Sequence, residues 1–473
     1  MIRGIIVLVC LLSSRGAAAQ PLFTDAFPPE EFAARRATVL REIGDAVAVL
    51  QGAPEDPSYV KFRQNNQFFY LTGVEVPGAL LLLDGRAETA TLYLPPRDEV
   101  MERSEGPVLV PGAEAARLTG IATVAVRDRF APDLARAARR PIYVPHRPES
   151  RSAATPTQTM AAAAASAGDP WEGRPSRARA FVDKVKAAAA GSEIRDLDPI
   201  LDRLRVIKSP REIAVIRDAT RLSGLAIMEA MRVARPGMFE HELEAIGDYV
   251  FKRHNARGAA YFALVAAGAN AYYPHYHAGQ SRIRNGDLVL YDYGPDYHYY
   301  AADVTRQFPA NGRFSAAQRE LYTAYLRLYQ ALMQSIRPRV APSEVLRDAA
   351  ARMDRIVSAF RFSDDRHRKA ALEFVQQFRA SRDSLGHYVG MEVHDVTAPF
   401  DTLQPGMVFT IEPALTIAED RIYIRLEDMI LVTESGYENL SGFVPVEPDE
   451  IEEVMTQIPQ WVHPKPKGKT NHE

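Results

Sequence analysis

The chain has 473 residues, with 60 acidic against 57 basic side chains, 47% hydrophobic residues, 25% charged residues and one cysteine. These are the proportions of an ordinary globular protein, and they exclude a disordered, collagen-like or disulfide-built chain. The formal charge of −3 provides no basic surface for nucleic acid, so DNA and RNA binding are excluded as well. The length predicts two or three domains.

The first residues predict a secretory signal peptide over 1–19. Arg3 precedes the apolar run Ile5 to Leu12, and three small residues end at Ala19, where a signal peptidase would cut. The run is shorter than the roughly 20 residues that span a bilayer, which makes a membrane anchor the weaker alternative. Cleavage would remove Cys10 and leave an exported chain, periplasmic or secreted, whose metal ligands come from Asp, Glu and His.

Short apolar strands alternate with helical stretches between residues 28 and 195. A helix is expected over 31–43, and strands are expected over 46–50, 78–83, 91–94, 122–126 and 142–144. This alternation predicts a small α/β amino-terminal domain. Within it, residues 152–175 are rich in Ala, Ser, Thr, Gly and Pro, and this composition predicts an exposed loop insertion.

A long helix is predicted to begin after Ser209. This serine can cap the helix, Pro210 takes the first helical position, and Glu212 completes a capping box. Further helices are expected over 240–254, 316–335 and 343–360, with short β-rich stretches between them. The sequence therefore predicts a mixed α+β catalytic domain over 203–447, followed by a polar tail at 464–473.

Two aspartates are predicted to face each other across a hairpin. The run Leu288 to Leu290 indicates a strand that ends at Asp292, and a returning strand from Tyr299 brings back Asp303. If the turn is centred between residues 297 and 298, the two residues pair directly, with Cβ atoms about 5 Å apart. Such a like-charged pair is costly unless a proton or a cation lies between the carboxylates.

Further polar residues follow towards the C-terminus. Arg425 and Glu427 share one face of a predicted strand, and Glu412 shares a face of another strand with Thr410. Before them come two histidines seven residues apart and two glycines that permit a close backbone approach: His387, His394, Gly386 and Gly390. Each residue alone is typical of a turn, a surface ion pair or a structural histidine. Together they indicate a metal site.

The order of these residues closely resembles the ligand pattern of the pita-bread metallopeptidases, which include aminopeptidase P, prolidase and methionine aminopeptidase. All five expected ligands are present: Asp292, Asp303, His387, Glu412 and Glu427. The resemblance covers residues 209–447, and residues 62–73 are similar to the amino-terminal domain of aminopeptidase P. It implies a pita-bread catalytic domain after a smaller α/β domain, and hydrolysis of the N-terminal Xaa-Pro bond of peptides.

The resemblance also implies the role of each ligand. Asp292 would bind one metal, and Asp303 and Glu427 would bridge two. His387 and Glu412 would complete the shell of the second metal, with Glu412 also acting as general base or proton shuttle. Oxygen and nitrogen donors favour manganese, with zinc or cobalt as alternatives. Two such ions about 3.5–4 Å apart can share the hydroxide that attacks the peptide bond.

Residues outside the metal shell complete the expected site. His275 and His394 would contact the scissile carbonyl, with His277 as the alternative to His275, and Arg425 would hold the ligand carboxylates. Asp383 stands where relatives commonly have a histidine, which would change how the leaving-group side of a peptide is received. The resemblance further implies proline-containing peptides as substrates and a dimer or tetramer. A prolidase restricted to dipeptides and a non-catalytic pita-bread module are the alternatives.

Overall fold

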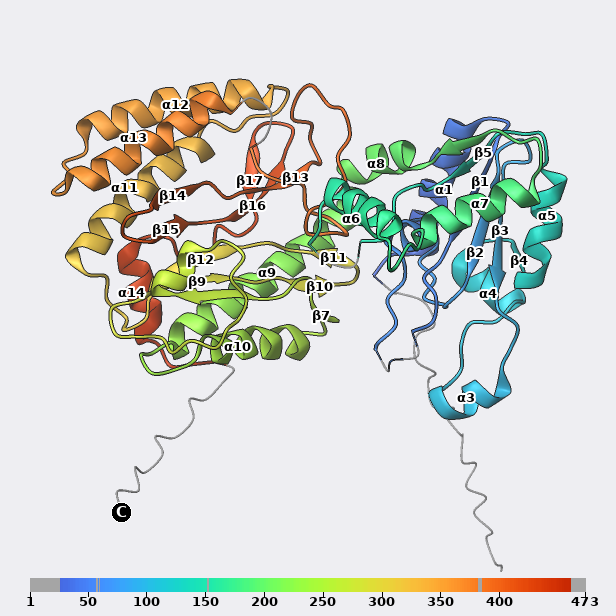
Figure 1. Cartoon of the computed structure of the whole chain (residues 1–473), viewed down its shortest axis with the longest axis horizontal. Helices are drawn as coiled ribbons and strands as arrows, with labels where there is room; N and C mark the ends of the chain where they lie inside the picture. The colour runs from blue at the N-terminus through green and yellow to red at the C-terminus, as the bar shows by residue number, and fades with distance from the viewer. Residues whose placement is uncertain (1–25, 57, 59, 151–152, 382–384, 461–473) are drawn as a thin grey trace, which may run out of the picture. The chain divides into compact units, whose positions relative to one another are not determined.

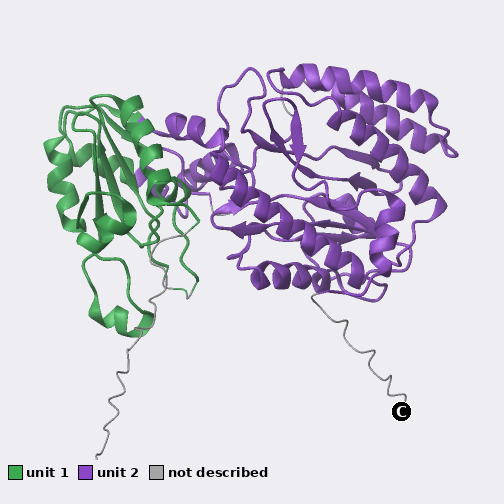
Figure 2. Ribbon diagram, turned by 180° about the vertical axis from the view of Figure 1, so that it is seen from behind, with its two compact units in different colours: residues 1–145, 181–195 green, residues 146–180, 196–473 purple. Residues whose placement is uncertain are grey.

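The structure is a computed structural model that describes residues 26–56, 58, 60–150, 153–381 and 385–460. The predicted signal peptide, Asp383 and the predicted tail lie outside the described residues. The chain divides into two compact units (Figure 2): residues up to 145 together with 181–195, and residues 146–180 together with those from 196 onward. None of the helices in the described ranges has the length and apolarity that crossing a membrane requires.

A six-stranded sheet in the order β4-β3-β2-β1-β5-β6 forms the core of the smaller unit. Its strands are β1 (Val47–Gln51), β2 (Leu80–Asp84), β3 (Thr89–Leu94), β4 (Thr123–Val126), β5 (Ile142–Val144) and β6 (Ile194–Asp196). β1 pairs antiparallel to β2 and parallel to β5, so it lies inside the sheet. Successive residues of β1 are buried on both faces, as expected for a strand that is covered from two sides.

Most helices of this unit pack against the sheet through apolar side chains. They are α1 (Pro29–Ile43), α2 (Asn66–Thr72), α4 (Ala113–Thr119), α5 (Phe130–Arg136) and α7 (Arg177–Ala188), with the 3-10 turn η1 (Arg127–Arg129) before α5, whereas α3 (Glu99–Glu105) has no buried residue. Phe130 of α5 and Phe181 of α7 join Val47 and Val49 in one buried cluster. α1 and α2 contact β2 and β1, respectively. The smaller unit is thus the α/β fold that the alternation of elements predicts.

Residues 153–175 differ from their predicted loop. They contain a helix, α6 (Pro156–Gly168), which begins with a capping box: the Thr155 hydroxyl accepts from the backbone N–H of Gln158 at 3.1 Å. Alanine has the highest helix propensity, so this alanine-rich segment forms a helix although its Ser, Thr, Gly and Pro content favours a loop. The segment also belongs to the larger unit, where Arg147 donates to both carboxylate oxygens of Asp202 at 2.9 and 2.7 Å.

The larger unit contains two groups of antiparallel strands, each contacted by its own helices (Figure 1). The first group is β7 (Gly258–Ala259), β8 (Leu264–Ala267), β9 (Leu288–Asp292), β10 (Pro295–Tyr297), β11 (Tyr300–Ala301) and β12 (Thr305–Pro309), with α9 (Pro210–Val233) and α10 (Glu240–Arg253). The second is β13 (Val408–Ile411), β14 (Ala414–Ile417), β15 (Ile422–Arg425), β16 (Asp428–Val432) and β17 (Tyr437–Asn439), with α11 (Ala316–Met333), α12 (Pro342–Ala359) and α13 (Asp365–Ala380). The remaining elements are α8 (Asp198–Val206), α14 (Pro448–Thr456) and the 3-10 turn η2 (Gly268–Tyr272).

The predicted start of α9 is confirmed. The Ser209 hydroxyl accepts from the backbone N–H of Glu212 at 3.2 Å, and the Glu212 carboxylate accepts from the backbone N–H of Ser209 at 2.9 Å. This reciprocal pair satisfies donors that a helix start otherwise leaves open.

The register of the aspartate hairpin differs from the prediction by two residues. The turn consists of His298 and Tyr299, both at positive φ, so Tyr297 pairs with Tyr300 and Asp292 pairs with Thr305. Asp303 therefore lies diagonally from Asp292 instead of directly opposite. A two-residue turn of this kind usually contains Asn or Gly, and neither residue is present to signal it.

Candidate metal centre

The structure brings the five predicted ligands together in the larger unit. His387 Nε2 lies 3.4 Å from Asp303 Oδ2, 3.3 Å from Glu412 Oε1 and 3.8 Å from Glu427 Oε1. Donor atoms of Asp303, His387 and Glu427 all lie within 4.8 Å of one another. Both strand groups contribute: Asp292 ends β9 and Asp303 precedes β12, whereas Glu412 follows β13 and Glu427 lies between β15 and β16.

Tyr261 joins the two aspartates, and the sequence reasoning missed it. Its hydroxyl lies 2.7 Å from Asp292 Oδ1 and 2.6 Å from Asp303 Oδ1, and the side chain is buried. Burial, together with the charges of both carboxylates, raises the pKa of Tyr261 well above its usual value, so the phenol keeps its proton. No motif around residue 261 points to this role, which depends on proximity in the fold.

Two residues of β12 hold Glu427 in place. The Thr305 hydroxyl donates to Glu427 Oε2 at 2.7 Å, and Arg306 Nη1 donates to the Glu427 backbone carbonyl at 2.8 Å. Thr305 was also missed, although a signal existed: it follows Asp303 by two positions and so shares its strand face. Groups of this kind orient a ligand and hold its charge in a buried site.

Local backbone contacts orient His387. Its Nδ1 lies 3.2 Å from the carbonyl of Tyr388, which leaves Nε2 directed at the carboxylates. The preceding Gly386 permits this placement, because a Cβ there would lie 1.9 Å from the carbonyl oxygen of Thr410. The predicted close backbone approach at Gly386 is therefore present, and it brings the histidine against β13.

The four carboxylates make the site strongly acidic. Burial and the charge of Asp303 raise the pKa of Asp292 to about 7, and the same two effects raise the pKa of Glu427 well above its usual value. Burial would also raise the pKa of Asp303 and Glu412, but hydrogen bonds from His387 lower both. Without a cation, part of this cluster is therefore stable only when protonated.

The donor set fits divalent cations. Glu427 Oε1 is fully buried and has no hydrogen-bond partner among the described residues, so a buried acceptor is left open at the centre of the cluster. Oxygen donors with one imidazole suit manganese, zinc or cobalt, and a cation would offset the repulsion that raises the carboxylate pKa values. These residues can therefore hold metal ions where the sequence predicts them.

Arg425 lies beside the cluster as predicted. Its guanidinium contacts Asp292 Oδ2, and its Nη1 donates to Glu412 Oε2 at 3.3 Å. Arg425 is buried, and the charges of Asp292 and Glu427 raise its pKa although burial alone would lower it. The arginine therefore holds ligand carboxylates in position and balances part of their charge.

The predicted substrate-contacting histidines lie in different environments. The ring of His394 lies 4.1 Å from that of His387, centroid to centroid, and its Nδ1 contacts the backbone carbonyl of Ala153. His275 is exposed after η2, and within the described ranges its side chain has no hydrogen bond or ion pair with the five ligands. His277, the alternative, is also exposed and packs on Phe262. The structure therefore brings His394 against His387, whereas His275 lies on an exposed segment.

Comparison with known proteins places this geometry in a family. The sequence profile of metallopeptidase family M24 matches residues 214–434, and that of the aminopeptidase P N-terminal domain matches residues 32–143. The chain is 32% identical to the Xaa-Pro aminopeptidase of Haemophilus influenzae over 453 residues, which cover 90% of this chain and 97% of that protein.

Solved structures agree over nearly the whole chain. Aminopeptidase P from Escherichia coli with the inhibitor Pro-Leu aligns with a TM-score of 0.73 and 30% identity, covering 91% of this chain and 98% of that one. Proline aminopeptidase P II from Yersinia pestis gives a TM-score of 0.73 and 32% identity, covering 91% and 99%. The expected fold, an amino-terminal domain followed by a pita-bread catalytic domain, is confirmed. The chain therefore belongs to the Xaa-Pro aminopeptidase (aminopeptidase P) family of M24 metallo-exopeptidases.

Proposed function

We propose that this protein is an exported enzyme that cleaves the N-terminal Xaa-Pro bond of peptides with a two-metal centre held by Asp292, Asp303, His387, Glu412 and Glu427. The observation that carries the proposal is the convergence of four carboxylates and one imidazole from two strand groups. A pair of divalent ions supplies the Lewis acidity that activates water as a hydroxide nucleophile near neutral pH. Manganese is the favoured metal, with zinc or cobalt as alternatives.

Glu412 is the carboxylate best placed to move a proton. Its side chain is 28% exposed, against 4% for Asp292, 8% for Asp303 and 1% for Glu427. Burial raises the pKa of Glu412, but the hydrogen bond from His387 and the charges of Arg425 and His387 together lower it, so this carboxylate is ionised and can accept a proton. It therefore serves as general base or proton shuttle, while the three buried carboxylates remain ligands.

His394 and His275 are the proposed contacts to the scissile carbonyl. His394 supports this role by its position against His387, with Nδ1 engaged by a backbone carbonyl and Nε2 available. His275 lies on an exposed segment and would reach the peptide when substrate binds. Donors to a developing oxyanion contribute about 3 kcal/mol each to transition-state stabilisation.

The test combines metal analysis with a matched pair of variants. We expect two equivalents of bound divalent metal in the full chain and release of the first residue from Xaa-Pro peptides. Glu412→Gln is expected to lower kcat by about 100-fold or more. Glu419→Gln, which changes an exposed carboxylate on the β14–β15 turn, is the matched control and should keep full activity. Metal-free protein with unchanged cleavage, or equal activity in both variants, would contradict the proposed centre.

Peptide length separates the proposed aminopeptidase from the prolidase alternative. A series from Xaa-Pro dipeptides to peptides of about ten residues is expected to give cleavage at every length. Activity on dipeptides alone would assign the chain as a prolidase-type dipeptidase, with the same metal centre retained.

Export and assembly need separate measurements. Export is expected from the apolar run before Ala19, and a mature protein that begins at Gln20 outside the cytoplasm would support it. Protein retained in the cytoplasm with Met1 intact would contradict it. A dimer or tetramer is expected in solution, and light scattering coupled to size-exclusion chromatography would detect a monomer instead.

A further inference from the structure

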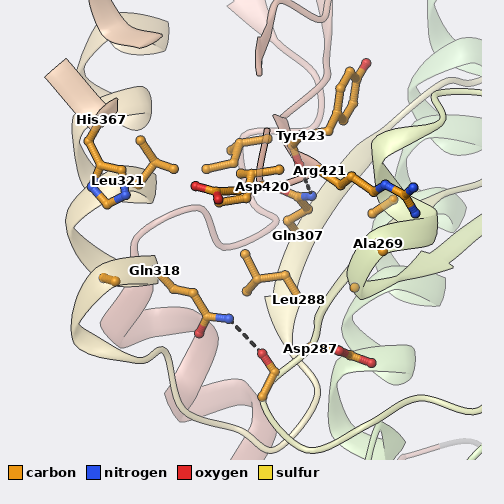
Figure 3. Close-up of a pocket in the computed structure, with 16 residues that line it drawn as sticks. Ala269, Asp287, Leu288, Gln307, Gln318, Leu321, His367, Asp420, Arg421 and Tyr423 are labelled. Atoms are coloured by element: carbon orange, nitrogen blue, oxygen red, sulfur yellow. Dashed lines mark hydrogen bonds between the residues drawn. The ribbon is translucent and has the colours of Figure 1, made fainter. Parts of the chain in front are cut away.

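A cavity lies in the larger unit beside strands that carry proposed metal ligands (Figure 3). Its volume is about 260 Å³. Apolar side chains from four elements form much of its wall: Ala269 of η2, Leu288 of β9, Leu321 of α11, and Ile422 and Ile424 of β15. The cavity is thus lined by both strand groups and by the helices α11 and α13, and it is partly open to solvent.

This cavity is distinct from the metal centre. None of the five proposed ligands borders it, and neither do Tyr261 and Arg425. Along β15, Ile422 and Ile424 lie on the opposite face from Tyr423 and Arg425 because side chains alternate along a strand. The Tyr423 ring points away from the other lining side chains in Figure 3. β15 is therefore a wall between the two sites.

One polar atom in the cavity lacks a partner. Gln307 is fully buried, and its Nε2 donates to the backbone carbonyl of Tyr423 at 2.8 Å. This bond assigns the other terminal atom as Oε1, an acceptor, and within the described part of the chain Oε1 has no hydrogen-bond partner. Figure 3 shows Gln307 in the middle of the lining residues. A buried acceptor of this kind is open to a hydrogen-bond donor on a molecule that occupies the cavity.

Several other polar side chains of the lining have partners within the described residues, and the Arg421 side chain is exposed. Gln318 donates to the carbonyl of Gly286 at 2.8 Å, and Asp287 accepts from the backbone N–H of Arg284 at 2.7 Å. Two further lining residues have partners outside the cavity: His367 with Glu320 and Asp420 with Arg366. The lining carboxylates of Asp287 and Asp420 are engaged by a backbone N–H and by an arginine, so the fully buried acceptor that stays open is the neutral amide oxygen of Gln307.

We propose that this cavity binds a small neutral molecule with an apolar body and one hydrogen-bond donor, a hydroxyl or an amide N–H, which donates to Gln307 Oε1. An apolar cavity of about 150 Å³ accepts benzene, so 260 Å³ suits a molecule of about ten heavy atoms.

The test uses two probes of equal size on the full metal-loaded protein. Benzyl alcohol and ethylbenzene both have eight heavy atoms, and they differ in a terminal hydroxyl against a methyl group. We expect benzyl alcohol to bind in ligand-observed NMR titrations. Gln307→Met is expected to weaken benzyl alcohol about fivefold or more, the size of one hydrogen bond, without weakening ethylbenzene. An equal effect on both probes would overturn the assigned hydrogen bond.

A second pair of variants tests the site if Gln307→Met does not fold. Ala317→Leu adds bulk at the cavity wall and should weaken benzyl alcohol at least tenfold, whereas Ala316→Leu, the adjacent exposed residue outside the lining, should leave binding unchanged. Absence of binding to the unmodified protein, or equal binding to both alanine variants, would overturn the proposal.

Binding should persist after chelation of the metal and in the presence of a saturating Xaa-Pro peptide. Competition with that peptide would assign the probe to the peptidase cleft and refute a separate site. Because the readout is binding, its outcome is independent of the proposed peptidase activity.

Discussion

Replacement of Tyr261 by phenylalanine is the most direct test of how the fold supports the metal centre. The variant keeps the ring and removes one hydroxyl that lies 2.7 Å from Asp292 Oδ1 and 2.6 Å from Asp303 Oδ1. A phenol has one proton, so it donates one full bond at a time, and the two contacts must not be counted twice. A hydrogen bond to a buried carboxylate contributes about 1.5–3 kcal/mol.

That energy converts into a measurable loss of metal affinity. At about 1.4 kcal/mol per factor of ten, Tyr261→Phe should weaken metal binding by about 10- to 100-fold, which is also the usual effect of removing a group that orients a ligand. The measurement is a competition titration with a chelator of known affinity, followed by kcat/KM at saturating metal. We expect part of the activity to return when metal is added in excess.

Tyr293→Phe is the matched control. Its hydroxyl donates to Asp248 at 2.8 Å, and its ring packs edge-on against Tyr261 at 6.2 Å. It removes a neighbouring phenol that contacts no proposed ligand, so metal affinity should stay within about twofold of the unmodified protein. Equal metal affinity in Tyr261→Phe and in the unmodified protein would refute the reasoning, and so would an equal loss in both variants.

Three further predictions follow from buried contacts. The pKa of Asp292 is raised to about 7, and those of Glu427 and His387 are raised as well, so protons compete with metal and metal affinity should fall at least tenfold per pH unit below pH 7. In the metal-free chain the raised pKa of Asp292 makes protonation favour the folded state, so stability should decrease as the pH rises from about 4 to 7. A metal affinity that is independent of pH between about 5.5 and 7.5 would contradict this prediction. Asp395→Ala should lower the free energy of unfolding by about 3–5 kcal/mol in urea denaturation, because it leaves Arg205 and Lys208 buried without their shared carboxylate, and a loss below about 1 kcal/mol would count against it. Gly386→Ala should reduce metal content, since its Cβ would lie 1.9 Å from a carbonyl oxygen of β13, and a fully metallated variant would show that the strand can move aside.

The chemistry of the candidate site could be predicted from the sequence because it depends on residue types and their order. Metal ions select oxygen and nitrogen donors, and the order of five such residues along the sequence is enough to suggest a metal site. The start of α9 was equally accessible, since a capping box is a contact between residues three apart. Local interactions of this kind can be recognised from residues that are close together in the sequence.

Other features depended on which segments meet in the folded chain. Tyr261 is separated from Asp292 and Asp303 by 31 and 42 positions in the sequence, and no motif near Tyr261 predicts these contacts. The aspartate register moved by two residues because the turn uses His298 and Tyr299 at positive φ, without the glycine or asparagine that usually marks such a turn. The open acceptor of Gln307 likewise exists only because β12, β15 and α11 enclose it. The proposed ligands could thus be recognised from residue types and their resemblance to a family pattern, whereas the groups that orient those residues were decided by tertiary packing, since hydrogen bonds between distant segments leave no pattern in the neighbouring sequence.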